Sequence, residues 1–423
     1  MECPLHQLAL RHPDHPLIEF DGGMITAWQA ERFVQGLTHH LFSWQGQPVH
    51  LRCPHHEKTL LVFVALYRLG AKIILIHPKD PIQSPHLIDP ISCSLDGFTT
   101  SKPIFFKHAE SLILFPTSGS TQAPKLIAHT LKTLLASAAS SASYYQLEGK
   151  KFHLSLPLNH VGGMMIFFRM VVGQGTVVLN PHSRCDFYSF VPTQLHRLLK
   201  AGIPPNSPYR QATLLIGGAP ISEDLITSSL REALRLCCTY GMTETASQIT
   251  AGSFSCGHPL PGKELKIGQD QGIYVKANSL FVGYGLDQSP VPLTDGYFAT
   301  RDLGTYDPDH GLIVIGRKDR VIIKGGENIH PEILEELILA HQAVESATCV
   351  GVEDEEYGQL IACFISPYDP SIFEEVNRSI LHRLGPYFLI NHFHPAPVTL
   401  GLKPRFKELQ LAANARIKRE KIL

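Results

Sequence analysis

Hydrophobic positions between residues 60 and 250 switch repeatedly between a helical spacing and short β-branched runs. From Leu60 to Leu69 the apolar spacing suits a helix, Gly70 suits its end, and KIILIHP reads as a strand closed by proline. The alternation continues through SLILFPTSGS (strand), HTLKTLLASAASSASYYQL (helix), GTVVLNP (strand), VPTQLHRLLKAG (helix) and ATLLIGGAP (strand), with another helix from about 222 to 236. This order predicts a layered α/β architecture with mainly parallel sheets, whose functional loops lie at the carboxyl ends of strands.

The spacing changes at two further points along the chain. Between residues 257 and 315 the short runs KELKI, GIYVKA, LFVGY, DGYFAT and GLIVIG predict an antiparallel sheet or a small barrel-like subdomain. After the charged, glycine-bearing stretch GRKDRVIIKGGENIHP, the runs EILEELILAHQ, SATCVGV, QLIACFIS and FEEVNRSILHRL predict a small α+β domain that ends in a basic helix. We therefore expect an N-terminal domain of residues 1–317 and a C-terminal domain of residues 318–423.

Length, charge and cysteine content narrow the class of protein. A chain of 423 residues is longer than single cores usually grow, so more than one domain is expected. The net charge of -1 and the pI of about 7.1 call for neither nucleic acid nor an anionic membrane as a partner. Nine scattered cysteines without a C-x-x-C pair favour free thiols in a reducing, cytoplasmic compartment.

Targeting and membrane signals are weak in the sequence. The N-terminus lacks the basic segment and long apolar core of a secretory signal. The apolar stretch from Leu60 to Ile76 is interrupted by Arg68, Gly70 and Lys72, so we expect a buried helix and strand there and no membrane span.

The run PTSGSTQAPK at residues 116–125 follows a predicted strand and is rich in hydroxyl groups. Backbone amides and hydroxyls at the carboxyl end of a strand are suited to hold phosphate, and Lys125 would add positive charge. Serine, threonine, glycine and proline are also ordinary turn residues, so a surface turn is the alternative. The spacing is not that of a Walker loop.

Two further runs carry candidate ligands. In TYGMTETAS, Glu244 could hold Mg²⁺ together with phosphate oxygens, or Thr243 could cap the start of a helix with an acidic first turn. In DGYFATRDLG we place Asp302 in a turn between strands, where it could accept both hydroxyls of a ribose with help from Arg317 in GRKDR. An ordinary hairpin turn is the alternative.

Taken together and in this order, the runs resemble the motifs of the AMP-forming adenylating enzymes, a family that includes the acyl-CoA synthetases. The phosphate loop, YGMTETAS, ATRDLG, GRKDRVIIKGGENIHPEILEE and a late lysine occur in the family's sequence order, and the likeness covers about residues 10–415. Within the family the likeness is greatest to the o-succinylbenzoate:CoA ligases of menaquinone biosynthesis, through LSLPLNHVGGMMIFFRM, VPTQLHRLL, LLIGGAPIS, GHPLPGKELKI and DGYFATRDLG.

This resemblance implies an AMP-forming acid-thiol ligase that uses ATP, Mg²⁺ and CoA. A carboxylate would attack the α-phosphate of ATP to give an acyl-adenylate and pyrophosphate, and the thiol of CoA would then displace AMP. The small C-terminal domain would be mobile and would rotate between the two steps about a hinge at Asp319. The partners would be small molecules, and the sequence is compatible with a monomer or a homo-oligomer.

The resemblance also assigns roles to individual residues. The β- and γ-phosphates would be held by the loop residues Ser118, Gly119, Ser120, Thr121 and Lys125. Magnesium would be positioned by Thr121 and Glu244, and the α-phosphate would contact Thr243. The adenine and acyl groups would lie along Gly217, Gly218, Ala219, Tyr240 and Gly241, and the ribose would bind Asp302 and Arg317.

Four more assignments concern the acid, the chemistry and the thiol. His160 would stand between the acyl and thiol pockets, although an ordinary loop histidine is the alternative. Arg169 would pair with the second carboxylate of o-succinylbenzoate, or else with an Asp or Glu of the chain, because a lone arginine among apolar neighbours is costly. Lys403 would stabilise the transition state of adenylation, and Gly326 would line the passage for the pantetheine arm.

Two positions depart from the family pattern. Gln122 stands where the phosphate loop usually has glycine, and Lys403 is followed by Pro404 and a basic RFK run, which leaves Lys407 as an alternative catalytic lysine. The competing functions are another aryl or acyl-CoA synthetase, a weakly active or non-catalytic adenylate-binding relative, and a domain that loads a carrier protein. Arg169 distinguishes an o-succinylbenzoate ligase from the first of these alternatives, because a ligase for a monocarboxylate needs no buried cation.

Overall fold

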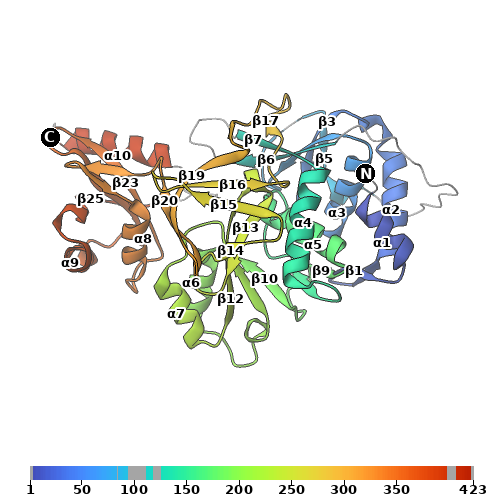
Figure 1. Ribbon diagram of the computed structural model, residues 1–423, viewed down its shortest axis with the longest axis horizontal. Helices are drawn as coiled ribbons and strands as arrows, with labels where there is room; N and C mark the ends of the chain where they lie inside the picture. Colours follow the sequence, from blue (N-terminus) through green and yellow to red (C-terminus); the bar gives the residue numbers. More distant parts are fainter. Residues whose placement is uncertain (1–2, 83, 94–110, 118–124, 398–405, 421–423) are drawn as a thin grey trace.

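The computed structural model describes residues 3–82, 84–93, 111–117, 125–397 and 406–420. These residues form four sheets, three in the N-terminal part of the chain and one in the C-terminal part, which lies at one end of the long axis (Figure 1). The expected classes of element are confirmed: a large part of layered sheets and helices is followed by a small α+β part. Among the described residues, no helix is long and apolar enough to cross a membrane.

The largest sheet has nine strands in the order β14-β13-β12-β11-β10-β8-β9-β1-β2. The run from β12 through β1 is parallel, and β13, β14 and β2 add to its two edges in antiparallel fashion. Its strands are β1 (Pro16–Phe20), β2 (Gly23–Thr26), β8 (Lys151–His153), β9 (Thr176–Val178), β10 (Phe187–Phe190), β11 (Thr213–Ile216), β12 (Arg235–Met242), β13 (Ser247–Gly252) and β14 (His258–Pro259).

The second sheet has six strands in the order β17-β7-β6-β4-β3-β5. They are β3 (Pro48–Arg52), β4 (Lys72–Ile76), β5 (Leu87–Ile88), β6 (Leu112–Thr117), β7 (Lys125–Thr130) and β17 (Gly283–Tyr284). Strands β6 and β7 form an antiparallel pair that ends with Thr117 opposite Lys125. This pairing places the two ends of the run that the sequence predicts to bind phosphate, whose residues 118–124 lie outside the described part of the chain.

Three helices share one hydrophobic core with strands of both sheets. They are α3 (Glu57–Arg68), α4 (Leu131–Tyr145) and α5 (Val161–Gly173), and side chains from β1, β3, β4 and β8 belong to the same cluster. Helices α1 (Pro4–Arg11) and α2 (Ala27–His40) contribute to its edge, and α6 (Pro192–Ala201) and α7 (Glu223–Arg231) cover a second core against β10, β11 and β12. Burial of apolar area in this layer is the main term that holds the two sheets together.

The third sheet is antiparallel, as the short strands predict. Its strands β15 (Lys263–Ile267), β16 (Gly272–Ala277), β19 (Tyr297–Asp307), β18 (Leu293–Thr294) and β20 (Gly311–Arg317) all pair in antiparallel fashion. Three details of the sequence prediction are wrong. The run LFVGY joins the second sheet through β17, because Gly283 pairs with Ala128. The helix after ATLLIGGAP ends at Arg231, since residues from Arg235 onward complete the large sheet as β12.

The third correction concerns Asp302, which lies within strand β19 and not in a turn. It pairs with Arg317 of β20, and the register shifts at the next residue pair, between Leu303 and Gly304. Arg301 takes a left-handed backbone with φ of 67°, so the strand is irregular here without ending. In DGYFATRDLG only Asp295 and Gly296 form a turn, and the residues from Tyr297 onward, Asp302 included, belong to the irregular strand β19.

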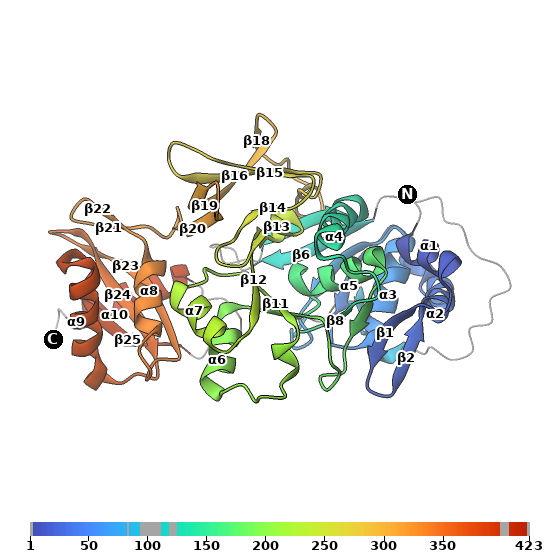
Figure 2. The same ribbon diagram turned by 60° about the horizontal axis from the view of Figure 1, so that its bottom comes forward.

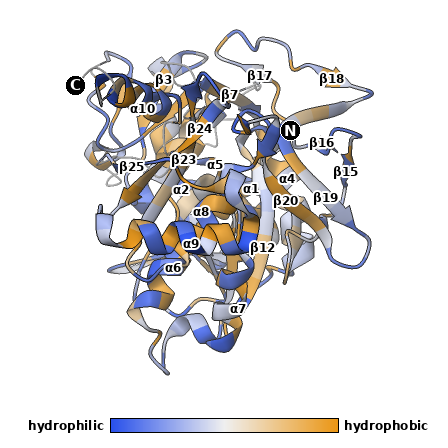
Figure 3. Ribbon diagram, turned by 90° about the vertical axis from the view of Figure 1, so that its left-hand side faces the viewer, coloured by the Kyte–Doolittle hydropathy of each residue, from blue (hydrophilic) through white to orange (hydrophobic). Residues whose placement is uncertain are grey.

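The C-terminal part is a sheet with helices on both faces. Its strands are β21 (Ile322–Lys324), β22 (Glu327–Ile329), β23 (Ser346–Asp354), β24 (Gly358–Ser366) and β25 (His392–Pro395). Helices α8 (Pro331–Leu339) and α9 (Phe373–Leu384) pack in one core, and α10 (Phe406–Glu420) packs on the other face. In Figure 3, α9 carries both hydrophilic and hydrophobic residues, as expected for a helix with one face on a sheet.

Candidate active site

The YGMTETAS run forms the tight connection between strands β12 and β13. Residues Thr243–Thr245 make one turn of 3-10 helix, and a strand follows at Ser247, so the alternative in which Thr243 caps an α-helix is wrong. A side chain at Gly241 would collide with the carbonyl of Ser247, which explains glycine at this close approach. The buried His129 of β7 holds the turn through a 2.7 Å hydrogen bond between its Nε2 and the Thr243 carbonyl.

Burial sets the protonation of His129. It lowers the pKa of the imidazole to about 4, against the smaller opposing effect of the Thr243 carbonyl. A neutral ring can donate to this carbonyl while its Nδ1 lies 2.9 Å from the hydroxyl of Thr133. The hydrogen bond to Thr243 thereby joins strand β7 to the turn that carries Glu244.

Asp302, Tyr240 and Arg317 form a second group next to this turn. The Tyr240 hydroxyl donates to Asp302 at 2.7 Å, and Arg317 reaches the other carboxylate oxygen at 3.4 Å. Burial raises the pKa of Asp302, while the Tyr240 hydrogen bond and the Arg317 charge oppose that rise. Beside it lies a pocket of about 330 Å³, also lined by Arg301, Lys318 and Asp319 among others.

Lys125 and Glu244 approach each other from different sheets. The Lys125 ammonium lies 3.3 Å from the centre of the Tyr284 ring. Burial lowers the pKa of Lys125, and the charge of Glu244 partly restores it. Glu244 makes no ion pair with any residue in the described ranges, so its carboxylate oxygens fit the requirement for a cation that also binds phosphate.

Gly217, Gly218 and Ala219 lie directly after strand β11, at its carboxyl end. Gly218 has φ of 84°, a left-handed backbone that favours glycine, and both Gly218 and Ala219 are exposed. Their backbone therefore faces open space beside the neighbouring strand β12, which carries Tyr240 at the same sheet edge. This is where ligands of α/β sheets are expected.

Arg169 is buried in helix α5, with 2% of its surface exposed. Its one hydrogen bond in the described structure goes from a guanidinium NH2 to the hydroxyl of Ser247, at 3.0 Å, and its Nε has no partner. Burial lowers its pKa to about 10, and no carboxylate of the described residues pairs with it. The alternative of an ion pair with an Asp or Glu therefore fails within this part of the chain.

His160 lies just before α5, exposed at the helix start, with its carbonyl accepting from the backbone N–H of Met164. A buried residue that the sequence reading missed lies near Arg169: Lys263 of β15, which donates to the hydroxyl of Ser137 at 3.2 Å and to the Gln248 carbonyl. The run KELKI predicts only a short strand, and the packing of α4 and β13 over Lys263 reveals its burial.

The chain passes from the large to the small part between Arg317 and Arg320. Arg317 contacts Asp302 of β19 and makes two hydrogen bonds to Asp319, of 2.9 and 3.1 Å. Among the described residues, the side chain of Arg320 bonds only within the small part, to Glu332, Glu335 and the carbonyl of Cys349. Asp319, between them, is exposed.

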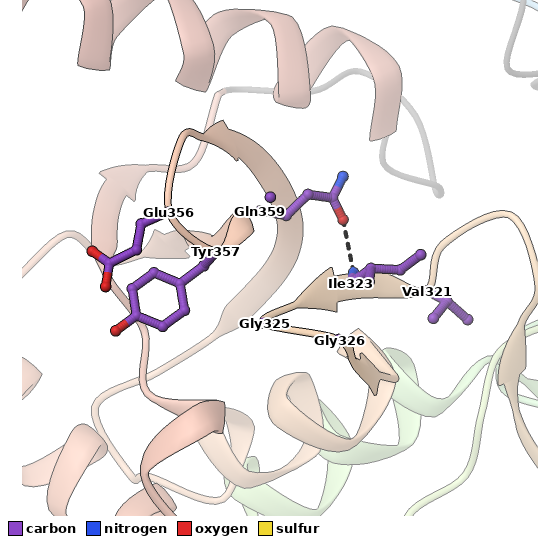
Figure 4. A pocket seen from close by; sticks show the side chains of 8 residues that line it. Val321, Ile323, Gly325, Gly326, Glu356, Tyr357 and Gln359 are labelled. Carbon is purple, nitrogen blue, oxygen red and sulfur yellow. Dashed lines mark hydrogen bonds between the residues drawn. The ribbon is translucent and has the colours of Figure 1, made fainter.

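Gly326 lies in the small part, on a hollow of about 720 Å³ that is also lined by Gly325, Tyr357 and Gln359 (Figure 4). The side chain of Gln359 accepts a hydrogen bond from the backbone of Ile323 and closes one side of that hollow. In this arrangement the hollow is lined by residues 321–359 alone and takes nothing from the large part.

The structure thus brings Lys125, Glu244 and Thr243 together, and Tyr240, Asp302, Arg317 and Asp319 together. It leaves Gly326 in a separate hollow. Five of the expected site residues lie outside the described residues: Ser118, Gly119, Ser120, Thr121 and Lys403. The same holds for Gln122.

Comparison with known proteins gives the family. Residues 94–283 match the model of AMP-binding enzymes, and residues 334–400 match that of the AMP-binding enzyme C-terminal domain. The chain is 33% identical over 350 residues to the 2-succinylbenzoate–CoA ligase of Salmonella typhimurium, covering 74% of this chain and 75% of that one. It is 31% identical over 388 residues to the 2-succinylbenzoate–CoA ligase of Haemophilus influenzae, covering 84% of each.

Solved structures agree with this likeness. The wild-type E. coli MenE with a bound phenylether-linked analogue of OSB-AMS superposes with a TM-score of 0.73 at 25% identity, over 99% of both chains. The o-succinylbenzoate CoA synthetase from Bacillus subtilis in complex with its acyl-adenylate intermediate has the same fold, with a TM-score of 0.82 at 23% identity over 96% of this chain and 97% of that one. The motifs, the geometry and the matched relatives lead to one conclusion: this chain belongs to the AMP-binding enzyme family.

Proposed function

We propose that this protein is an ATP-dependent acid:CoA ligase that converts o-succinylbenzoate (2-succinylbenzoate) to its CoA thioester in menaquinone biosynthesis. The observation that carries the substrate is Arg169: a buried guanidinium without a carboxylate partner in the described residues, bonded to Ser247 of the nucleotide motif. A dicarboxylic acid would supply the missing charge. Relatives over 30% identical bear the name of this ligase.

The reaction would have two steps, adenylation and thioester formation. In the first, an oxygen of the reacting carboxylate attacks the α-phosphorus of ATP, the bond to the bridging oxygen breaks, and pyrophosphate leaves. Asp302 and Arg317 would hold the ribose, Tyr240 would lie against the base, and Lys125 would bind the β- and γ-phosphates. In the second step the sulfur of CoA attacks the acyl carbon, and AMP leaves.

Glu244 and Thr121 would hold Mg²⁺, which neutralises charge on the phosphates during adenylation. The free carboxylate of Glu244 beside Lys125 is the support for this in the described part of the chain. His160, at the exposed start of α5, would stand between the acid and the thiol.

Domain movement completes the proposal. The large domain would be residues 1–317 and the mobile one residues 318–423, with the hinge at Asp319. The support is the change of partners between Arg317 and Arg320. Rotation at Asp319 would carry Lys403 away from the nucleotide and bring Gly326 toward the thiol.

A cytoplasmic location fits the free state of all nine cysteines.

The test is a pyrophosphate-release assay with ATP, Mg²⁺ and a panel of acids, followed by CoA-thioester detection. We expect release with o-succinylbenzoate and little with simple aryl or fatty acids. Release with a fatty or aryl monocarboxylate alone would contradict the substrate assignment. Release with no acid would contradict catalysis and leave a non-catalytic adenylate-binding relative.

Lys403 is tested in the same assay. We expect Lys403→Ala to lose about a hundredfold or more of the adenylation rate, because a charge that stabilises the phosphoryl transition state is removed. Lys407→Ala is the matched control, since Lys407 is exposed at the start of α10. Normal adenylation by Lys403→Ala with loss in Lys407→Ala would transfer the role to Lys407.

A further inference from the structure

Lys263 is a buried cation that the proposed mechanism does not use. It is the first residue of β15 and has 7% of its surface exposed. Its ammonium donates to two neutral oxygens, the hydroxyl of Ser137 in α4 and the backbone carbonyl of Gln248 in β13. A buried lysine in a purely structural role is expected to be paired with a carboxylate, and none of the described residues supplies one.

Lys263 and Arg169 lie in one polar cluster between α4, α5, β12 and β13. The guanidinium bonds to Ser247, and the ammonium bonds to the next residue, Gln248. The remaining groups that face them are neutral: Ser137, Ser141 and Tyr145 of α4 and Cys237 of β12. The cluster therefore holds two cations and, within the described ranges, no anion.

Arg169 lies close enough to Lys263 for its charge to affect the ammonium. Burial and, to a smaller extent, the charge of Arg169 together lower the pKa of Lys263 to about 7. Burial also lowers the pKa of Arg169. Ser247 and Tyr145, which contact the cluster, are only partly buried.

We propose that Lys263 is a specificity-determining residue of this ligase, and that with Arg169 it binds the carboxylate of the acid that is not activated. The inference rests on the proposed function and deepens it. A bound carboxylate supplies the negative charge that the cluster lacks. It can accept hydrogen bonds from the guanidinium and the ammonium at the same time. The cost of burying two like charges is offset only when that acid is bound, so an acid with one carboxylate gains less from the site.

Charge on Lys263 gives the site a dependence on pH. With its pKa near 7 in the free protein, the ammonium is increasingly neutral as the pH rises through that value. Binding of the second carboxylate therefore weakens above neutral pH. Arginine in its place stays charged throughout this range.

The experiment measures pyrophosphate release for the unmodified protein, Lys263→Met, Lys263→Arg and the control Lys266→Met. Lys266 lies on the same strand, and its side chain is exposed over the Tyr297 ring. The acids are o-succinylbenzoate and two analogues that each lack one carboxylate, 4-oxo-4-phenylbutanoate and 2-butanoylbenzoate. The analogue that keeps the reacting carboxylate serves as the monocarboxylate substrate.

We expect Lys263→Met to raise the KM for o-succinylbenzoate by roughly tenfold to a hundredfold, the loss of one charge-assisted hydrogen bond. Its KM for the monocarboxylate and for ATP, and its Tm, should stay near those of the unmodified protein. Lys266→Met should change none of these. Between pH 6.5 and 9, the KM of the unmodified protein for o-succinylbenzoate should rise, whereas that of Lys263→Arg should stay low and flat.

The inference is overturned if Lys263→Met raises KM equally for both acids, if it leaves KM unchanged, or if Lys263→Arg keeps the pH dependence. Should Lys263→Met not fold, the pH profile of Lys263→Arg decides alone. If the unmodified protein is active on o-succinylbenzoate and any of these results is found, only the role of Lys263 is refuted. An unmodified protein inactive on o-succinylbenzoate would refute the proposed substrate and this inference with it.

Discussion

Single side chains of this site owe their chemistry to their surroundings. Asp302 is typical: burial raises its pKa, and the donors Tyr240 and Arg317 hold it ionised against that effect. His129 is the reverse case, a base that burial keeps neutral. In both, the residue type alone says little, and the neighbours from other strands decide the charge.

Replacement of Asp302 tests the ribose site. We expect Asp302→Asn to raise the KM for ATP by roughly tenfold or more, because an ionised acceptor for the ribose hydroxyls is lost. The KM of the unmodified protein for ATP should also rise as the pH falls, since a raised pKa means that Asp302 becomes neutral earlier. Steady-state kinetics measure both, with Asp309→Asn in the exposed β19–β20 turn as the control. An unchanged KM for ATP would remove Asp302 from the site.

His129 predicts how stability depends on pH. Its pKa is about 4 in the folded protein and ordinary in the unfolded chain, so the unfolded state binds more protons between these values. The contribution of His129 to the free energy of unfolding is therefore fully present above pH 6.5. It is lost as the pH drops toward 4, by up to about 3 kcal/mol. Urea unfolding at pH 7 and pH 5 should show the loss, and His129→Gln should reduce it. Equal slopes in both proteins would contradict this.

At the scale of elements, three segments that lie far apart in the sequence come together at the candidate site. The β6–β7 pair places Lys125, the β12–β13 connection places Thr243 and Glu244, and the irregular β19 places Asp302. The segment between β20 and β21 then connects them to the small part through Arg317, Asp319 and Arg320. The partners change from the large part to the small part within this segment, which is where a hinge is expected.

A proline at the hinge should separate the two half-reactions. We expect Asp319→Pro to impair one of them at least tenfold more than the other, because a fixed φ restricts rotation between the two arrangements. Pyrophosphate release reports the first step, and thioester formation from preformed acyl-adenylate reports the second. Asp319→Ala, which removes the hydrogen bonds to Arg317 without fixing φ, is the matched variant. Equal losses in both steps would place the hinge elsewhere.

At the scale of the whole molecule, the small part rests on the large one through α8, beside α6 and α7 (Figures 1 and 2). Lys200 of α6 donates to the carbonyl of Gln342 at 3.1 Å. Glu336 of α8 lies near two acidic residues of α7. Burial and the charges of Asp224 and Glu223 raise its pKa, against the smaller opposing effects of a hydrogen bond from the Glu223 backbone and the charge of Arg383. When Glu336 is ionised, the charges of Asp224 and Glu223 repel it across this contact.

The same contact predicts a pH-dependent domain arrangement. A raised pKa means that the docked arrangement binds a proton at Glu336 more tightly, so docking is favoured as the pH falls and weakens as it rises. Small-angle scattering should show a larger radius of gyration at pH 8 than at pH 5 in the absence of ligands. Asp224→Asn should reduce that difference, and Asp14→Asn, in an exposed turn near the N-terminus, should not. A radius independent of pH would contradict the prediction.

The sequence by itself determined the alternation of strands and helices, the antiparallel third sheet, the small α+β part and the family, because hydrophobic period and motif order are local properties of the chain. It placed Lys125, Glu244 and Arg317 in candidate sites. Only the tertiary structure decided that Asp302 lies in a strand, that the helix of α7 ends early, and that Lys263 is buried beside Arg169. These depend on which distant segments pack over a residue, and burial of charge is a property of that packing, which no local spacing records.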